Sequence, residues 1–233
     1  MDVTLTLGLI ALLSYLAGSI PTGVIISRLI FGFDIRSKGS GNMGSTNAFR
    51  VLGWKWGVTV QVIDMLKGIF AVAVIAVVLG KGISFPNATG FEDITLIKVG
   101  AGVFAVIGHI WSVFVNFKGG KGVNTAAGML MALVPIDVAI AFGMFGIAVI
   151  FSGYVSLGSI SAAFAIPSSL FVRHNYLNAD IPGYSTLIYF SLFILALVVF
   201  THRSNIKRML EGKENRFNKL RLIKLKSSSS DRS

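Results

Sequence analysis

Three polar stretches in this chain carry residues that could do chemistry. The first, KGSGNMGSTNAFR at residues 38–50, mixes glycines with small polar side chains and is flanked by Lys38 and Arg50. Glycines let a ligand approach backbone N–H groups, and arginine can hold a phosphate with two hydrogen bonds. The stretch predicts an anion-binding loop. The alternative is a polar loop whose cations reflect membrane topology. The neutral residues expected to bind are Ser40, Gly41, Asn42, Thr46 and Asn47.

The spacing of Gly39, Gly41 and Gly44 also matches the G-x-G-x-x-G pattern of dinucleotide sites. That pattern requires a preceding strand, a following helix and a ribose-binding acid about 20 residues further on. Here an apolar run precedes the glycines, and the acid at that spacing is Asp64, inside the next apolar run. A nucleotide-binding fold is therefore not expected.

The second stretch, GHIWSVFVNFKGGKGVNTAAG at 108–128, places Lys121 among Gly119, Gly120 and Gly122 at the start of an expected helix. A helix N-terminus favours anions, so this loop also predicts phosphate binding. It is not a Walker A loop, because a glycine follows the lysine. The alternative is a tight turn whose lysines mark the cytoplasmic side.

The third stretch, HRSNIKRMLEGKE at 202–214, puts His202 and Asn205 three residues apart on one helical face. The shorter VSLGS at 155–159 contributes Ser156 and Ser159, which could bind a ligand or cap the next helix. Three further ionisable residues lie inside apolar runs and are interpreted as structural support for the site: Asp64 and Lys67, which can pair on one helical face, and His109.

Composition defines the elements that must position these residues. The 233 residues are 54% hydrophobic and 13% charged, with a mean hydropathy of +0.76 and no cysteine. Disulfides, thiolate metal sites and cysteine nucleophiles are thereby excluded. Apolar runs long enough to cross a bilayer, and without strand-like alternation, predict an all-α integral membrane protein. The runs cover 3–27, 57–80, 99–117, 122–172 and 184–201.

Charge distribution predicts the topology. Most of the 21 Lys and Arg residues lie in three regions, 28–55, 118–121 and the tail from 202, which the positive-inside rule assigns to the cytoplasm. The run 122–172 must then cross an odd number of times, with breaks near Pro135 and 153–156. The prediction is a seven-helix bundle over residues 1–212 with its N-terminus outside, followed by a basic, disordered cytoplasmic tail at 213–233. The piece 122–134 is short and would sit off-centre or be re-entrant.

This topology brings all the polar motifs to the cytoplasmic face, where they would form a pocket for a molecule with an anionic head and a lipid tail. A rival interpretation is a transporter or channel for an organic phosphate, which would need polar residues running to both faces. The outer halves of the runs are instead plain aliphatic and aromatic.

The motifs resemble the bacterial membrane acyl-phosphate:glycerol-3-phosphate acyltransferases, the PlsY family. The resemblance runs in order over nearly the whole chain, through GSIPTG, DIRSKGSGNMGSTNAFR, DMLKG, GHIWSVFVNFKGGKG, VSLGS and HRSNIKRMLEGKE. It implies transfer of a fatty acyl group from acyl phosphate to the 1-hydroxyl of glycerol 3-phosphate, giving lysophosphatidic acid and inorganic phosphate. Two positions depart from the family pattern, where alanine is more usual: Ser45 and Asn124.

The resemblance also implies the site. Ser40, Arg50 and Lys121 are expected to be catalytic, with His202 and Asn205 helping to hold glycerol 3-phosphate. The base is either His202 or the departing phosphate itself, and the latter is preferred. Direct transfer is expected, with no metal, cofactor or acyl-enzyme. The expected partners are the two substrates and the lipid bilayer of the bacterial inner membrane, with the active site facing the cytoplasm, and neither nucleic acid nor an obligate protein partner.

Overall fold

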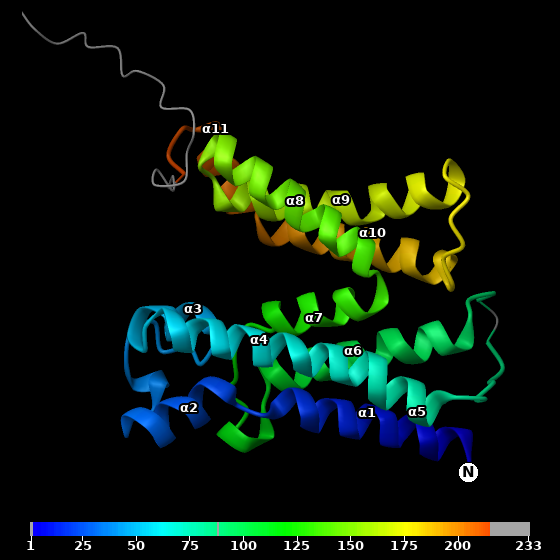
Figure 1. Ribbon diagram of the computed structural model, residues 1–233, viewed down its shortest axis with the longest axis horizontal. Helices are drawn as coiled ribbons and strands as arrows, with labels where there is room; N and C mark the ends of the chain where they lie inside the picture. The colour runs from blue at the N-terminus through cyan, green and yellow to red at the C-terminus, as the bar shows by residue number, and fades with distance from the viewer. Residues whose placement is uncertain (1, 88, 215–233) are drawn as a thin grey trace, which may run out of the picture. The chain divides into compact units, whose positions relative to one another are not determined.

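The computed structural model describes residues 2–87 and 89–214, in which helices are joined by short turns and no strand is present (Figure 1). Contacts divide the chain into two compact units, Met1–Pro135 and Ile136–Ser233, which are considered separately below. The predicted basic tail lies almost wholly outside the described residues, so the predicted division into a membrane domain and a tail stays a prediction.

The first unit contains the helices that carry the first two polar stretches. In chain order they are α1 (Val3–Ser19), α2 (Thr22–Phe31), the short 3-10 turn η1 (Ile35–Ser37), α3 (Ser45–Val51), α4 (Trp54–Phe70) with its π-helical continuation η2 (Ala71–Ile75), α5 (Ala76–Gly80), α6 (Asp93–Ile110), the 3-10 turn η3 (Val113–Val115) and α7 (Val123–Leu133).

Glycines allow two pairs of helices in this unit to cross with their backbones in close approach. A Cβ on Gly18 of α1 or Gly108 of α6 would lie 2.0 or 2.1 Å from a carbonyl oxygen of the other helix. Gly68 of α4 and Gly128 of α7 meet in the same way, at 2.1 and 1.9 Å. Small residues at helix contacts are typical of membrane bundles, where packing rather than water exclusion drives association. These crossings hold α6 against α1 and α7 against α4.

The first apolar run, predicted as one uninterrupted segment, is broken at Ile20–Pro21 into α1 and α2. Proline has no N–H and cannot continue the hydrogen-bond ladder, so carbonyls before it lose their partners. Side chains from elsewhere in the unit replace them: the hydroxyl of Ser112, in the turn after α6, donates to the Ser19 carbonyl, and the ammonium of Lys67, on α4, donates to the Ile20 carbonyl. The break is thus satisfied internally, as a nonpolar surrounding requires.

The second unit contains α8 (Pro135–Ser152, starting at the boundary residue), α9 (Val155–Asn175), α10 (Tyr184–Thr201) and α11 (Arg203–Leu210). The predicted breaks near Pro135 and 153–156 are the points where α8 and α9 begin. In the first turn of α8, the buried Asp137 accepts hydrogen bonds from Ser169 at 2.7 Å and Arg173 at 2.6 Å, both on α9.

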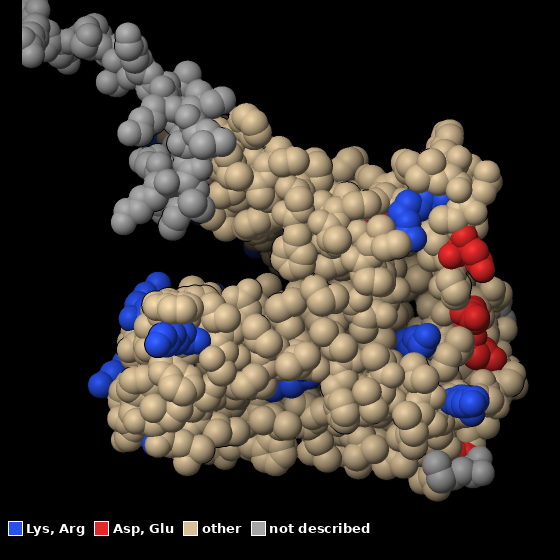
Figure 2. Space-filling model, viewed as in Figure 1, with Lys and Arg blue, Asp and Glu red and all other residues tan. Residues whose placement is uncertain are grey.

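Six segments of the described chain are long and apolar enough to cross a membrane: Val3–Phe31, Trp54–Gly80, Asp93–Val115, Pro135–Ser152, Val155–Asn175 and Tyr184–Thr201. The seventh predicted span corresponds to α7, whose 11 residues extend about 16 Å, against a hydrocarbon core of ~30 Å. Figure 2 shows Lys and Arg at both ends of the first unit, while the Asp and Glu visible on it lie toward the end opposite α3. The seven-span count and the orientation of the termini remain predictions.

Candidate active site

The first polar stretch forms a compact loop organised around Asn47. This side chain is 1% exposed, and its amide nitrogen donates to the carbonyls of Ile35, Lys38 and Asn42 at 3.3, 3.1 and 2.8 Å. Its oxygen accepts the Ser40 N–H at 2.9 Å. Both polar atoms of the Asn47 side chain are therefore used within the loop, so the geometry does not favour Asn47 as a ligand-binding residue.

The glycines of this loop serve the chain itself. Gly39 and Gly41 have φ values of +63° and +71°, and a Cβ on Gly39 would lie 2.2 Å from the Asn47 oxygen. The N–H groups of Ser40, Gly41 and Gly44 donate to Asn47, Lys38 and Asn42, respectively. Protein acceptors thus already occupy these three N–H groups, and the predicted binding of an anion by this loop stays a prediction.

An acidic residue that sequence reasoning did not single out fixes the entrance to this loop. Asp34 caps η1 by accepting the Arg36 N–H, and its carboxylate also binds the side chains of Arg36 and Arg28, each at 2.8 Å. The side-chain hydrogen bond from Arg36 and the other donors hold the pKa of Asp34 well below its usual range. The loop geometry should therefore not change with pH in the neutral range.

The second polar stretch doubles back on the end of α6. The N–H of Gly119 donates to the Ile110 carbonyl at 3.1 Å, and that of Gly120 donates to the His109 carbonyl at 2.9 Å. A Cβ on Gly119 would lie 2.1 Å from the His109 carbonyl oxygen, and one on Gly120 would lie 2.2 Å from His109 Nε2. Both glycines are required by this close packing. Gly122, at φ +75°, then starts α7.

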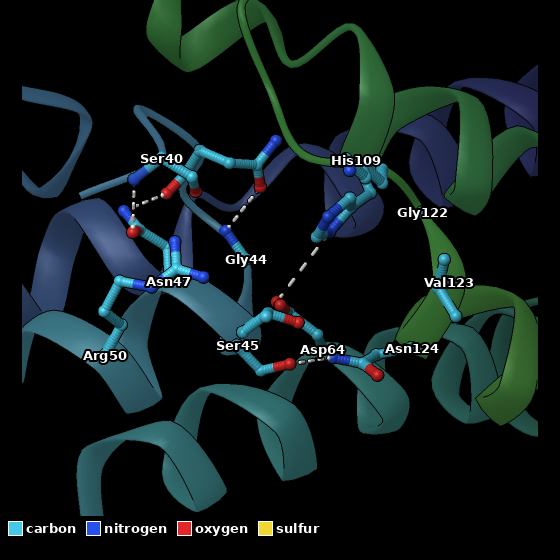
Figure 3. A pocket seen from close by; sticks show the side chains of 13 residues that line it. Ser40, Gly44, Ser45, Asn47, Arg50, Asp64, His109, Gly122, Val123 and Asn124 are labelled. Atoms are coloured by element: carbon cyan, nitrogen blue, oxygen red, sulfur yellow. Dashed lines mark hydrogen bonds and ion pairs between the residues drawn. The ribbon is translucent and has the colours of Figure 1, made fainter. Parts of the chain in front are cut away.

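These two loops meet in one pocket of about 290 Å³, shown in Figure 3. Arg50 and Lys121 both line it and both are exposed, and neither has an ion-pair partner among residues 2–87 and 89–214. Two unneutralised cations facing one cavity make it suited to an anion. The other lining residues are Ser40, Asn42, Gly44, Ser45, Thr46, Asn47, Asp64, His109, Gly122, Val123 and Asn124.

Beneath the pocket lies a buried polar cluster centred on Asp64, which is 1% exposed. Its Oδ1 accepts from the Lys67 ammonium at 2.6 Å and the Thr22 hydroxyl at 3.0 Å, and lies 3.8 Å from His109 Nδ1 (Figure 3). Lys67 also caps the broken first helix, as described above. The predicted pairing of Asp64 with Lys67 is present in the structure, and the cluster joins α2, α4 and α6.

Several residues predicted to bind substrate lie outside this pocket. The Lys38 ammonium sits over the ring of Phe33, 3.8 Å from its centroid. Gly41 and Gly119 line a separate, more open hollow with Arg36 and Lys118. Gly120 is packed against His109. These residues could therefore contribute to the site only indirectly, by fixing the conformation of the loops.

In the second unit, a glutamate gathers the predicted polar residues. Ser156 and Asn205 both donate to Glu214 Oε1 at 2.8 Å, and Arg208 donates to Oε2 at 2.7 Å. These donors, Asn205 foremost, lower the pKa of Glu214 to about 2. Ser159 donates instead to the Val155 carbonyl of its own helix.

His202 lies at the junction of α10 and α11, with Nδ1 2.9 Å from the Val198 carbonyl. Because a carbonyl can only accept, Nδ1 carries a hydrogen. Nε2 has no hydrogen-bond partner among residues 2–87 and 89–214.

Fold and site together define a class: an integral membrane protein of helices that carries a small cationic pocket. A sequence profile described as Glycerol-3-phosphate acyltransferase matches residues 8–212, and the chain belongs to this family. It is an acyltransferase. The Glycerol-3-phosphate acyltransferase of Chlorobium phaeobacteroides (strain BS1) is 44% identical over 229 residues, covering 91% of this chain and 96% of its relative.

Two crystal structures of PlsY, an integral membrane glycerol 3-phosphate acyltransferase, resemble this chain. The glycerol 3-phosphate form is 36% identical with a TM-score of 0.66, and covers 91% of this chain and 95% of its own. The lysophosphatidic acid form is 34% identical with a TM-score of 0.64, covering 90% and 94%. The expected family is thereby confirmed.

Proposed function

We propose that this protein transfers a fatty acyl group from acyl phosphate to the 1-hydroxyl of sn-glycerol 3-phosphate, forming lysophosphatidic acid and inorganic phosphate. The carrying observation is the pocket in which Arg50 and Lys121 stand without ion-pair partners among the described residues. The family supports glycerol 3-phosphate as the acceptor, and the two PlsY forms hold that acceptor and lysophosphatidic acid. The acyl phosphate donor rests on the resemblance of the motifs.

The cations address the main physical obstacle of this reaction. Both substrates are anions, and two unit charges at ~4 Å repel by about 4 kcal/mol at an effective dielectric constant near 20. Arg50 and Lys121 can neutralise the phosphates and align the hydroxyl with the acyl carbon. Alignment and charge stabilisation each contribute several kcal/mol to rate enhancement in enzymes. We assign Ser40, which also lines the pocket, to a phosphate or to the acyl carbonyl.

Acyl phosphate is already activated, so the proposed step is direct transfer. The hydroxyl oxygen bonds to the acyl carbon, the acyl–phosphate bond breaks, and the hydroxyl proton passes to the departing phosphate or to His202. We favour the phosphate, and assign His202 and Asn205 to holding glycerol 3-phosphate. The free Nε2 of His202 suits either role. We further propose that the protein lies in the bacterial inner membrane, with the site open to the cytoplasm.

A three-arm assay tests the proposal. Purified protein in lipid receives labelled glycerol 3-phosphate with acyl phosphate, with acyl-CoA or with neither. Labelled lysophosphatidic acid with acyl phosphate alone is the expected result. Product with acyl-CoA would replace the proposed donor, and the absence of product from folded protein in every arm would refute the reaction.

A further inference from the structure

Two neutral side chains that line the pocket, one from each polar stretch, form a direct hydrogen bond. Asn124 Nδ2, on the second residue of α7, donates to Ser45 Oγ, on the first residue of α3, at 2.8 Å (Figure 3). Ser45 is buried, Asn124 is half-buried, and both line the pocket that Arg50 and Lys121 face. The pair therefore belongs to the site and joins the two loops that carry its cations.

This pair differs from the other amides of the pocket because its side chains retain both a free donor and a free acceptor. The Asn47 amide is used within the loop, and Asn42 Oδ1 accepts the Gly44 N–H, which leaves Asn42 only its Nδ2 hydrogens to offer. The side chains of Ser45 and Asn124 have no second hydrogen-bond partner in the part of the chain that the structure describes. The hydroxyl hydrogen of Ser45, one amide hydrogen of Asn124 and its Oδ1 are thus left for a ligand.

The free groups select the kind of ligand atom. A dianionic phosphate oxygen can only accept hydrogen bonds, and the amide oxygen of Asn124 would face it unfavourably. A hydroxyl both donates and accepts, so it can satisfy Oδ1 and one of the two donors together. Neither side chain takes up a proton near neutral pH, so the pair suits a hydroxyl that keeps its proton through the reaction.

We propose that Ser45 and Asn124 form a hydroxyl-binding subsite for the unreacted 2-hydroxyl of glycerol 3-phosphate. The proposal rests on the proposed function, because it requires this acceptor to occupy the pocket. In this arrangement the cations would bind the phosphate groups, and the neutral pair would bind the 2-hydroxyl.

The test compares two ligands that differ by one hydroxyl, glycerol 3-phosphate and 3-hydroxypropyl phosphate. Dissociation constants are measured by calorimetry on the purified full chain without an acyl donor. A site built around a hydroxyl should bind the analogue lacking it about 5- to 20-fold more weakly, as expected for one or two neutral hydrogen bonds. Asn124→Ala should bring this ratio to within about twofold of unity, and Ser45→Ala should lower it in the same direction.

Val123→Ala is the matched control, because Val123 is the neighbouring lining residue and offers no polar group. It should keep the wild-type ratio. A wild-type protein that binds both ligands equally or neither, or variants that weaken both ligands equally, would overturn the subsite. Should Asn124→Ala fail to fold, Ser45→Ala alone decides. Absence of acyl transfer from acyl phosphate, with the ratio shift intact, would refute the proposed function and leave the subsite standing.

Discussion

Replacing Gly120 by alanine should impair the use of glycerol 3-phosphate indirectly, by displacing the neighbouring Lys121. The new Cβ would lie 2.2 Å from His109 Nε2 and 3.0 Å from Cδ2. Ordinary carbon contacts are about 3.5–4 Å, so one of the two groups must move by roughly 1 Å. The His109 ring is 3% exposed and enclosed by the Asp64 cluster, which leaves the loop as the part that yields.

The size of the effect follows from that displacement. Overpacking of this kind costs about 1–3 kcal/mol of stability. The residue after Gly120 is Lys121, and a shift of ~1 Å in a positioning group can cost about 100-fold in rate. We therefore expect kcat/KM for glycerol 3-phosphate to fall about 100-fold, or ~2.7 kcal/mol of transition-state stabilisation, with a raised KM.

Steady-state kinetics with acyl phosphate as donor, together with Tm in the same lipid, would measure both effects. The matched control is Gly100→Ala in α6, since nothing lies within 4 Å of a Cβ there. It should keep wild-type kinetics and, if anything, raise Tm, because alanine is the better helix former. Wild-type kinetics in Gly120→Ala would refute the account of this loop as packed on His109.

Three further outcomes are expected. Arg50→Ala and Lys121→Ala should each abolish detectable acyl transfer while leaving Tm close to wild type, because both side chains are exposed; near-normal turnover in either would contradict the site. Asp137→Asn should lower the free energy of unfolding by about 3–5 kcal/mol, because it leaves the Arg173 guanidinium without its anion. Urea or thermal unfolding would measure this loss, and an unchanged Tm would exclude a structural role for the pair. Glu214→Gln should destabilise the protein by a constant amount above pH 4.5 and by progressively less as pH falls toward 2. The reason is that the pKa of Glu214 is lowered in the folded protein, so its stabilising contribution is lost on acidification. A difference in Tm between variant and wild type that grows below pH 4.5 would contradict this assignment.

The helix boundaries that the sequence marks with a strong local signal are those that could be predicted. Pro135 begins α8, and Gly153, at φ +78°, precedes α9, as the length of the run 122–172 required. The break at Pro21 was missed because the run around it carries no charge and is long enough for a single span. The polar residues on either side of Pro21, together with a lysine in the next run, were the available signals.

The roles of polar side chains within a loop were less predictable. In the sequence, Asn47 and Asn42 cannot be told apart from asparagines that bind a ligand. Their hydrogen-bond partners are loop carbonyls and N–H groups that only the fold brings near. The bond between Ser45 and Asn124 was equally hidden. The sequence showed two separate departures from a family pattern, and the structure shows that they are one contact.

Glycine-rich loops beside cations are commonly interpreted as sites where backbone N–H groups bind phosphate. In this protein the hydrogen bonds of those N–H groups favour a different role for the glycines. Those of Gly41, Gly44, Gly119 and Gly120 are all taken up by protein acceptors. The glycines therefore shape the loops, and we propose that anion binding depends on the side chains of Arg50 and Lys121. Glycine substitutions should then act by moving the cations, so the weakening of glycerol 3-phosphate binding by Gly120→Ala, measured by calorimetry without an acyl donor, should shrink in a background where Lys121 is already alanine. Equal defects in the two backgrounds would instead return the backbone to the role of direct phosphate ligand.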